Sequence, residues 1–163
     1  MKASDAMARY LVEHKVHHCF DLAGGMITHL LDSLSKQREI VITPMHHEQG
    51  AAFAAESIAR ATRGKELGLA MGTSGPGATN LITGLCSCWF DSVPCLFITG
   101  QVNESELKGD SGVRQQGFQE LDIVSMVKGV TKYCVQVRNG GSLLPELHRA
   151  CGIAMSGRKG PVL

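Results

Sequence analysis

The chain has 163 residues, of which 44% are hydrophobic and 19% charged, and its formal net charge is +1. This length suits one globular domain with a buried core, and the composition is ordinary for a folded α/β protein and excludes a disordered one. Lys and Arg are scattered along the chain, so we expect neither a nucleic acid nor a membrane as a partner.

The first 14 residues carry charges every few positions and no continuous apolar stretch, so they predict a helix and not a signal peptide. No stretch reaches membrane-spanning length. Six cysteines in such a chain are more typical of reduced thiols than of a disulfide framework, which predicts a cytoplasmic protein. Cys86 and Cys88 would point about 200° apart on a helix, and we interpret them as inert, packed thiols.

Short apolar runs alternate with helical patterns along the chain. In order, we expect helix 4–14 with Ser4 as its N-cap, strand 16–20, helix 26–36, strand 39–43, helix 48–63, strand 67–71, helix 76–88, strand 94–100, helix 119–127, strand 132–137 and helix 142–156. The closing "GPVL" resembles the start of another strand, so we expect a fragment of a longer polypeptide. Apolar strands joined by helices predict an α/β fold, a three-layer sandwich whose mostly parallel central sheet has helices on both faces.

Three glycine-rich or polar turns follow predicted strands: "LAGG" at 22–25, "PMHHEQG" at 44–50 and "GTSGPGATN" at 72–80. Ligands of parallel sheets bind at the carboxyl ends of the strands, so all three turns are expected on one rim. The third turn partly resembles a dinucleotide fingerprint, but Asn80 stands at its sixth position. It also resembles a nucleophile elbow around Ser74, but Pro76 replaces the second glycine that the elbow needs.

We assign no metal site from the sequence. "GDS" at 109–111 with the Asn-Gly pair at 139–140 imitates a motif that binds Mg²⁺ and diphosphate, but it lies in a polar, loop-like segment. Adjacent histidines in a strand face opposite ways, so neither histidine pair, at 17–18 or 46–47, clamps one ion easily. For the first pair we expect one buried ring and one facing away.

Glu48 opens the predicted helix 48–63. A stripe of small and apolar residues along that helix is expected to pack on the sheet, with Glu56 and Arg60 paired on the other side. Glu48 leads the buried side, and the residues alone leave two interpretations: a solvated first-turn acid, or an acid aimed into a cleft. The helix N-terminus favours the carboxylate, whereas burial favours the neutral acid.

Four separated segments carry a family resemblance: "HEQGAAFAAESIARATRG", "GTSGPGATN", "CWFDSVPCLFITGQV" and "FQELDIVSMVKGVTKY". In this order they closely resemble the N-terminal, pyrimidine-binding domain of thiamine-diphosphate enzymes, specifically the acetolactate synthase family. The resemblance implies one such domain over 1–163, with the middle and diphosphate-binding domains outside the chain. It further implies decarboxylation of pyruvate or a related 2-oxoacid, followed by ligation of the resulting enamine to a second 2-oxoacid.

By this resemblance Glu48 is the catalytic acid. It would hydrogen-bond N1′ of the cofactor's aminopyrimidine and, kept protonated by a dry cleft, favour the imino tautomer that removes the thiazolium C2 proton. The other residues that the resemblance assigns are the cofactor-binding Gly24, Gly25, Pro76, Asn80 and Gln119, and Phe118 in the substrate channel.

The chain departs from the family pattern on the substrate side. Leu22 and Ala23 replace an aromatic residue and a proline, His46 replaces an arginine, and Gln116 stands where an acid is typical. The segment before "FQE" is also longer than usual. These departures bear on the substrate more than on the cofactor.

The resemblance implies that Mg²⁺ binds through the absent diphosphate domain, that the active site forms with that domain of another subunit, and that the protein is a homodimer or a higher homo-oligomer. It leaves FAD open and implies that the isolated chain is inactive. Three alternatives remain: a simple 2-oxoacid decarboxylase, a split enzyme whose diphosphate domain is a second polypeptide, and a non-catalytic interaction domain.

Overall fold

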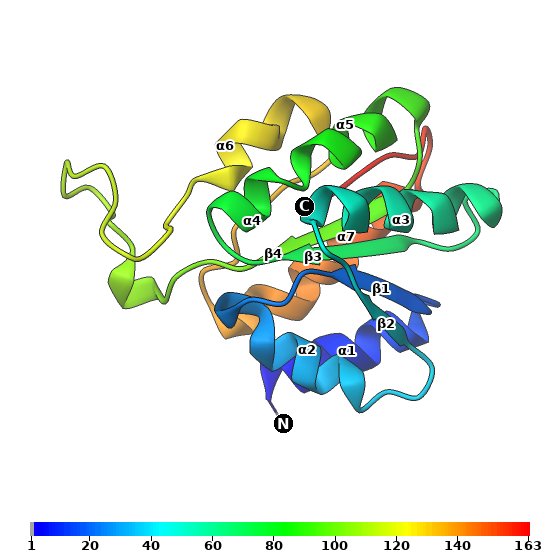
Figure 1. The fold of residues 1–163 in the computed structure, drawn as a ribbon, viewed down its shortest axis with the longest axis horizontal. Coiled ribbons are helices and arrows are strands. Elements are labelled where there is room, and N and C mark those ends of the chain that lie inside the picture. The colour runs from blue at the N-terminus through cyan, green and yellow to red at the C-terminus, as the bar shows by residue number, and fades with distance from the viewer. Residues whose placement is uncertain (1) are drawn as a thin grey trace.

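The computed structural model describes residues 2–163 and has a central sheet of four parallel strands in the order β2-β1-β3-β4. These strands are β1 (His18–Asp21), β2 (Val41–Pro44), β3 (Gly68–Gly72) and β4 (Cys95–Thr99). Helices lie above and below the sheet (Figure 1). The predicted three-layer α/β fold with a parallel sheet is confirmed.

Each face of the sheet has its own apolar cluster. One face packs against α1 (Ala3–Glu13), α2 (Thr28–Ser35) and α7 (Leu143–Met155). The other packs against α3 (Glu48–Ala61), α5 (Ile82–Asp91) and α6 (Ile123–Val127). Because helices cover both faces of the central strand β3, all five of its residues are buried.

Shorter elements connect these layers. A four-residue helix, α4 (Pro76–Thr79), follows β3. Residues 2–163 also contain four 3₁₀ turns: η1 (Gly25–Ile27), η2 (Glu104–Glu106), η3 (Lys128–Val130) and η4 (Gly140–Ser142). Strands run from right to left in Figure 1, so α4 and the long loop after β4 lie at the edge where the strands end.

The predicted strand 132–137 is wrong as a full strand. Tyr133 forms only an isolated bridge to Val162, although Lys132 N–H donates to the Pro161 carbonyl at 2.9 Å. Val162 in turn donates to Cys95 O at 2.9 Å, so the two segments extend the sheet beyond β4 in parallel. Within residues 2–163, the only bridge of the segment 132–137 is the one between Tyr133 and Val162, so the ladder is short.

Two predicted helices differ from the structure. The helix predicted over 76–88 is divided into α4 and α5, because Leu81 N–H donates to the Ala78 carbonyl three residues back and not four. The helix predicted over 119–127 begins only at Ile123, since Gln119 has the left-handed φ of +58° and Asp122 caps the helix by accepting from the Ser125 N–H at 3.0 Å.

Ser4 is not the N-cap of α1. The cap position is Lys2, whose side chain makes no cap hydrogen bond, and Ser4 lies inside the helix. The Ser4 hydroxyl instead accepts from Ser33 Oγ at 2.8 Å, which ties α1 to α2. In the folded protein Ser4 therefore links two helices, although its residue type alone indicated a helix cap.

Candidate functional site

The three predicted turns meet at the edge of the sheet where the strands end. β1 leads into residues 22–25, β2 into the start of α3, and β3 into α4, and these strands pair in parallel register. The expectation of a shared rim is confirmed. This edge brings polar side chains and tightly packed glycines together.

Glu48 is the first residue of α3, and its side chain is buried, with an exposed fraction of 5%. His47 caps the helix, since its Nδ1 accepts from the Gln49 N–H at 3.0 Å. Asn80 Nδ2 donates to Glu48 Oε2 at 2.9 Å, while Oε1 accepts no hydrogen bond from residues 2–163. The structure therefore supports a buried acid with one free oxygen over a solvated acid.

Glycines let the α4 turn approach Glu48. A Cβ placed on Gly77 would lie 2.7 Å from Thr73 Cγ2 and 3.1 Å from Glu48 Oε1. Similarly, a Cβ on Gly24 would lie 2.5 Å from Thr73 Cβ. Thr73 thus packs against both glycines, and the free oxygen of Glu48 borders backbone that carries no side chain.

Gln119 reaches the same turn from the loop after β4. Gly75 has φ +56° and ψ −120°, a conformation that favours glycine, and a Cβ there would lie 2.8 Å from Gln119 Cβ. Gly75, Pro76, Phe118 and Gln119 line one cavity of about 420 Å³. The turn 72–80 therefore borders Glu48 at Gly77 and Gln119 at Gly75.

Two of the predicted site residues are exposed to solvent. Gly25 begins the η1 turn and is exposed, with nothing within 4 Å of the position that a Cβ would take. Phe118 has an exposed fraction of 75% although it lines the cavity beside Pro76. Gly25 and Phe118 therefore do not cover the site.

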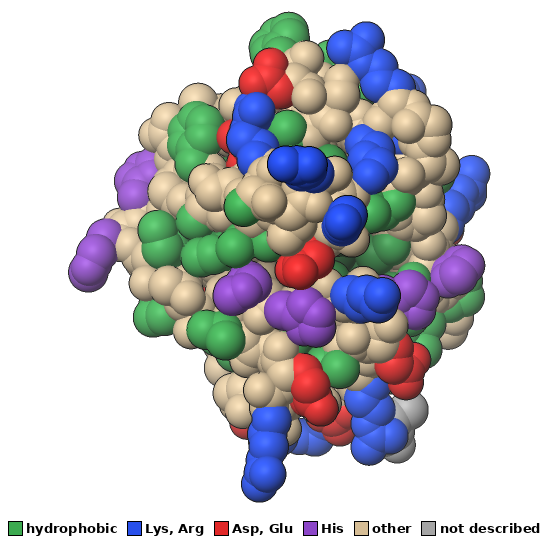
Figure 2. Space-filling view, turned by 90° about the vertical axis from the view of Figure 1, so that its right-hand side faces the viewer, with side chains coloured by type: hydrophobic (Ala, Val, Ile, Leu, Met, Phe, Trp, Pro, Cys, Tyr) green, Lys and Arg blue, Asp and Glu red, His purple; other side chains and the backbone are tan. Residues whose placement is uncertain are grey.

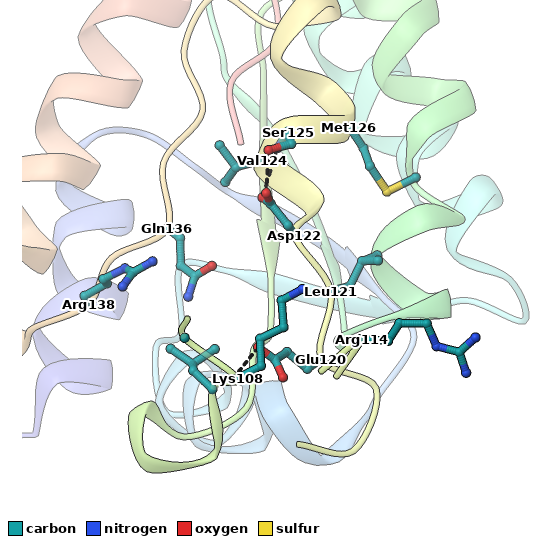
Figure 3. Close-up of a pocket in the computed structure, with 12 residues that line it drawn as sticks. Lys108, Arg114, Glu120, Leu121, Asp122, Val124, Ser125, Met126, Gln136 and Arg138 are labelled. Carbon is teal, nitrogen blue, oxygen red and sulfur yellow. Dashed lines mark hydrogen bonds between the residues drawn. The ribbon is translucent and has the colours of Figure 1, made fainter. Parts of the chain in front are cut away.

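A larger cavity of about 650 Å³ lies next to Gln119 (Figure 3). It is lined by residues 107–109, Arg114, residues 120–122 and 124–126, Gln136 and Arg138. Glu120 organises this loop: its Oε1 accepts from the Lys108 N–H at 2.8 Å, and its Oε2 accepts from the Gln116 N–H at 2.9 Å. These backbone donors lower the pKa of Glu120. Its ionised carboxylate thus ties the long segment before "FQE" to the site.

Asp21 is a buried acid that the sequence reasoning missed. It ends β1, has an exposed fraction of 2%, and its Oδ1 has no hydrogen-bond partner within residues 2–163. Burial raises the pKa of this carboxyl. The available signal was its place in the sequence, directly after an apolar run and just before a glycine turn.

We predict that Asp21→Asn stabilises the protein at neutral pH by about 1 kcal/mol, because it removes an unpaired buried charge. The folded-state pKa lies above the ordinary value of 3.8, so the stability of the unmodified protein falls as pH rises through the folded pKa. The advantage of the variant should therefore shrink on acidification toward about pH 4.

Urea unfolding at several pH values measures this difference. Asp110→Asn, in an exposed loop, is the matched control. An equal gain from Asp21→Asn at all pH values would contradict the unpaired-charge explanation.

Two other sequence expectations can be compared with the structure here. The Glu56–Arg60 pair exists, but Glu56 is buried and also accepts from Ser87 Oγ of α5 at 3.0 Å, so the expected solvent side is wrong for Glu56. His17 and His18 are both half-buried, so the expected contrast between them is wrong.

All six cysteines are free; Cys88 is buried, while Cys86 is half-buried. The neighbouring Cys95 thiol and burial both raise the pKa of Cys88.

Among residues 2–163, no group of three or more His, Cys, Asp or Glu side chains could hold a metal ion. In the same part of the chain, no helix is long and apolar enough to cross a membrane.

Comparison with known proteins gives one family model, "Thiamine pyrophosphate enzyme, N-terminal TPP binding domain", which matches residues 1–126. Similar proteins include an acetolactate synthase of Arthrospira platensis, 43% identical over 161 residues, which are 97% of the chain and 26% of that protein. The acetolactate synthase isozyme 3 large subunit of Escherichia coli is 34% identical over 163 residues, covering 100% of the chain and 27% of that protein.

An acetolactate synthase of Mycobacterium leprae is 39% identical over 163 residues, covering 100% of the chain and 25% of that protein. The chain therefore spans about a quarter of the length of these curated relatives. The similarity extends across the whole site described above, from the turn at 22–25 to Gln119.

Proposed function

The chain belongs to the thiamine pyrophosphate enzyme family, as its N-terminal TPP binding domain, and from this premise we propose that it is the pyrimidine-binding part of an acetolactate synthase-like enzyme. Such an enzyme decarboxylates pyruvate or a related 2-oxoacid and joins the product to a second 2-oxoacid. The observation that carries the proposal is the buried carboxyl of Glu48, with Oε2 held by Asn80 and Oε1 free at the rim of the sheet.

The residues at this rim fit the pyrimidine ring of thiamine diphosphate. A ring nitrogen can share a proton with a carboxyl oxygen, and Glu48 Oε1 has no competing partner among residues 2–163. The flat ring needs space beside that oxygen, and Gly77 borders it without a side chain. Ser74 Oγ, buried and without a partner in the described chain, is a further unused polar group in the same turn.

Under this proposal each of the site residues has a distinct role. Glu48 holds or moves a proton at Oε1, and Asn80 fixes the orientation of the carboxyl through Oε2. Gly24, Gly25, Pro76 and Gln119 would contact the cofactor, and Phe118 would line the entry for substrate. The chemistry that thiamine diphosphate supplies when bound is a nucleophilic carbon and an electron sink for the departing CO₂.

The remaining parts of the enzyme lie outside this chain. We propose that Mg²⁺ and the diphosphate bind to a separate domain of another subunit, in a homodimer or a higher homo-oligomer, and that FAD depends on a middle domain. The relatives are about four times as long as this chain, which leaves room for both domains. A simple 2-oxoacid decarboxylase and a split enzyme would use the same Glu48 chemistry.

Pyruvate turnover tests the proposal. We expect the isolated chain to be inactive, and the polypeptide completed with a diphosphate-binding domain to release CO₂ from pyruvate only with thiamine diphosphate and Mg²⁺ present. Acetolactate as the product supports a synthase, whereas acetaldehyde supports a decarboxylase. A completed protein that binds no thiamine diphosphate would contradict the proposal and favour a non-catalytic interaction domain.

A further inference from the structure

A second cavity lies at the opposite edge of the sheet, where the strands begin. It has a volume of about 320 Å³ and is lined by Trp89, Phe90, Ser92, Lys132, Arg158 and Lys159. Figure 2 shows this edge, with many Lys and Arg side chains gathered over its upper half. None of the described residues that line the cavity is acidic, and Glu48 lies at the other edge, where the strands end.

The three cations of this cavity are held by neutral oxygens. Arg158 Nε donates to Ser92 Oγ at 2.6 Å, and Lys159 Nζ donates to the Gly64 carbonyl at 2.6 Å. Lys132 Nζ donates to the Ser156 carbonyl at 2.7 Å and also to the Ile153 carbonyl. These bonds fix the positive charges in place and leave further N–H donors unused on each side chain.

Within residues 2–163, no carboxylate forms an ion pair with these cations. The ion pairs within residues 2–163 join Lys36 to Asp32 and Arg60 to Glu56 and Asp91, so none involves the cavity. Three fixed positive charges are a strong local excess in a chain whose net charge is only +1. Fixed cations with free N–H donors favour phosphate groups, which accept several charge-assisted hydrogen bonds at once.

Two aromatic rings stand beside the cations. Trp89 and Phe90 lie in the last turn of helix α5, with exposed fractions of 37% and 72%. Exposed aromatic faces stack on planar rings, and stacking on a base contributes about 1–3 kcal/mol. The lining thus combines a surface for a ring with charges for a phosphate.

We propose that this cavity binds a nucleoside phosphate, with the base against Trp89 or Phe90 and the phosphate against Lys132, Arg158 and Lys159. Its volume falls within the range of about 300–1,000 Å³ that is usual for small-molecule sites. A cavity of this size favours a small molecule over an acidic protein segment. The proposal is independent of the thiamine diphosphate function, because it uses other residues at the other edge of the sheet.

Titration of the chain with ADP tests this inference, because Trp89 is the only tryptophan and its fluorescence reports on the cavity directly. We expect a saturable fluorescence change with ADP that weakens as salt is raised. Adenosine and inorganic pyrophosphate should each bind at least about tenfold more weakly than ADP, since each lacks one half of the interaction.

Two variants assign the contacts. Arg158→Gln should weaken ADP about tenfold by removing a charge-assisted hydrogen bond, and Phe90→Ala should weaken ADP but not pyrophosphate. Arg114→Gln, an exposed cation at the other edge, is the matched control and should bind ADP normally. Circular dichroism verifies that each variant is folded.

The proposal is overturned if ADP gives no saturable change, or if Arg158→Gln binds ADP as the unmodified chain does. If pyrophosphate bound as tightly as ADP, the cavity would be an anion site that does not recognise a base, which also contradicts the proposal. Tighter binding of a poly-glutamate peptide than of ADP would assign the cavity to an acidic protein partner instead.

Discussion

Replacing Glu48 by Gln in the completed enzyme is expected to lower the rate of pyruvate decarboxylation by about 10²-fold or more, the range typical of a lost acid–base group. Gln is nearly isosteric and its side-chain oxygen can still accept the Asn80 N–H, so the fold of the α3 start should remain. The variant loses only the ability to exchange a proton at the position of Oε1. The measurement is kcat with saturating thiamine diphosphate, alongside cofactor affinity.

Glu56→Gln is the matched control for this prediction. Glu56 is also a buried glutamate of α3, but it accepts from Arg60 and Ser87, away from the rim. Its replacement should lower stability and leave kcat of the folded enzyme near that of the unmodified protein. If Glu48→Gln kept more than about half of the activity, Glu48 would not be the proton-transferring group.

Gly68→Ala is expected to destabilise the chain on the order of 3 kcal/mol or more. A Cβ on Gly68 would lie 2.0 Å from the Ala55 carbonyl oxygen, which belongs to the backbone of α3. The stripe of alanines at 51, 52, 55 and 59 lets α3 approach β3 this closely. Backbone cannot turn aside as a side chain can, so the whole helix would have to move and take Glu48 with it.

Thermal unfolding measures this effect, with an expected fall in Tm of about 6–12 °C. The control is Gly152→Ala, an exposed glycine of α7 with nothing within 4 Å of its Cβ position. That change should be neutral or stabilising by about 0.5–1 kcal/mol, because alanine favours a helix interior. A Tm for Gly68→Ala within about 2 °C of the unmodified protein would show that α3 does not pack as described.

Much of the architecture follows from local sequence patterns. Apolar runs separated by helical periodicity predicted the parallel sheet, and the resulting strand ends placed the turns at 22–25, 44–50 and 72–80 on one rim. The start of α3 at Glu48 was also predicted at the correct residue. These features depend on the order of residues within a short window, which a sequence displays directly.

Contacts between distant segments could not be predicted in this way. The hydrogen bond from Asn80 to Glu48 spans 32 residues, and its existence depends on how α4 packs against α3. Gln119 was expected inside a helix, but it has a left-handed backbone and packs on Gly75. At Gln119, the packing contact between two loops therefore outweighed the preference of the local sequence for a helix.

By itself, the sequence determined the layers of this protein, the parallel direction of its strands and the family to which its motifs belong. The tertiary structure decided which oxygen of Glu48 is free, that Glu56 is buried, that residues 132–137 form only a short ladder, and that Asp21 Oδ1 has no partner within residues 2–163. The reason is physical: local propensities act along a few residues, whereas burial and pairing depend on which distant surfaces meet when the layers close.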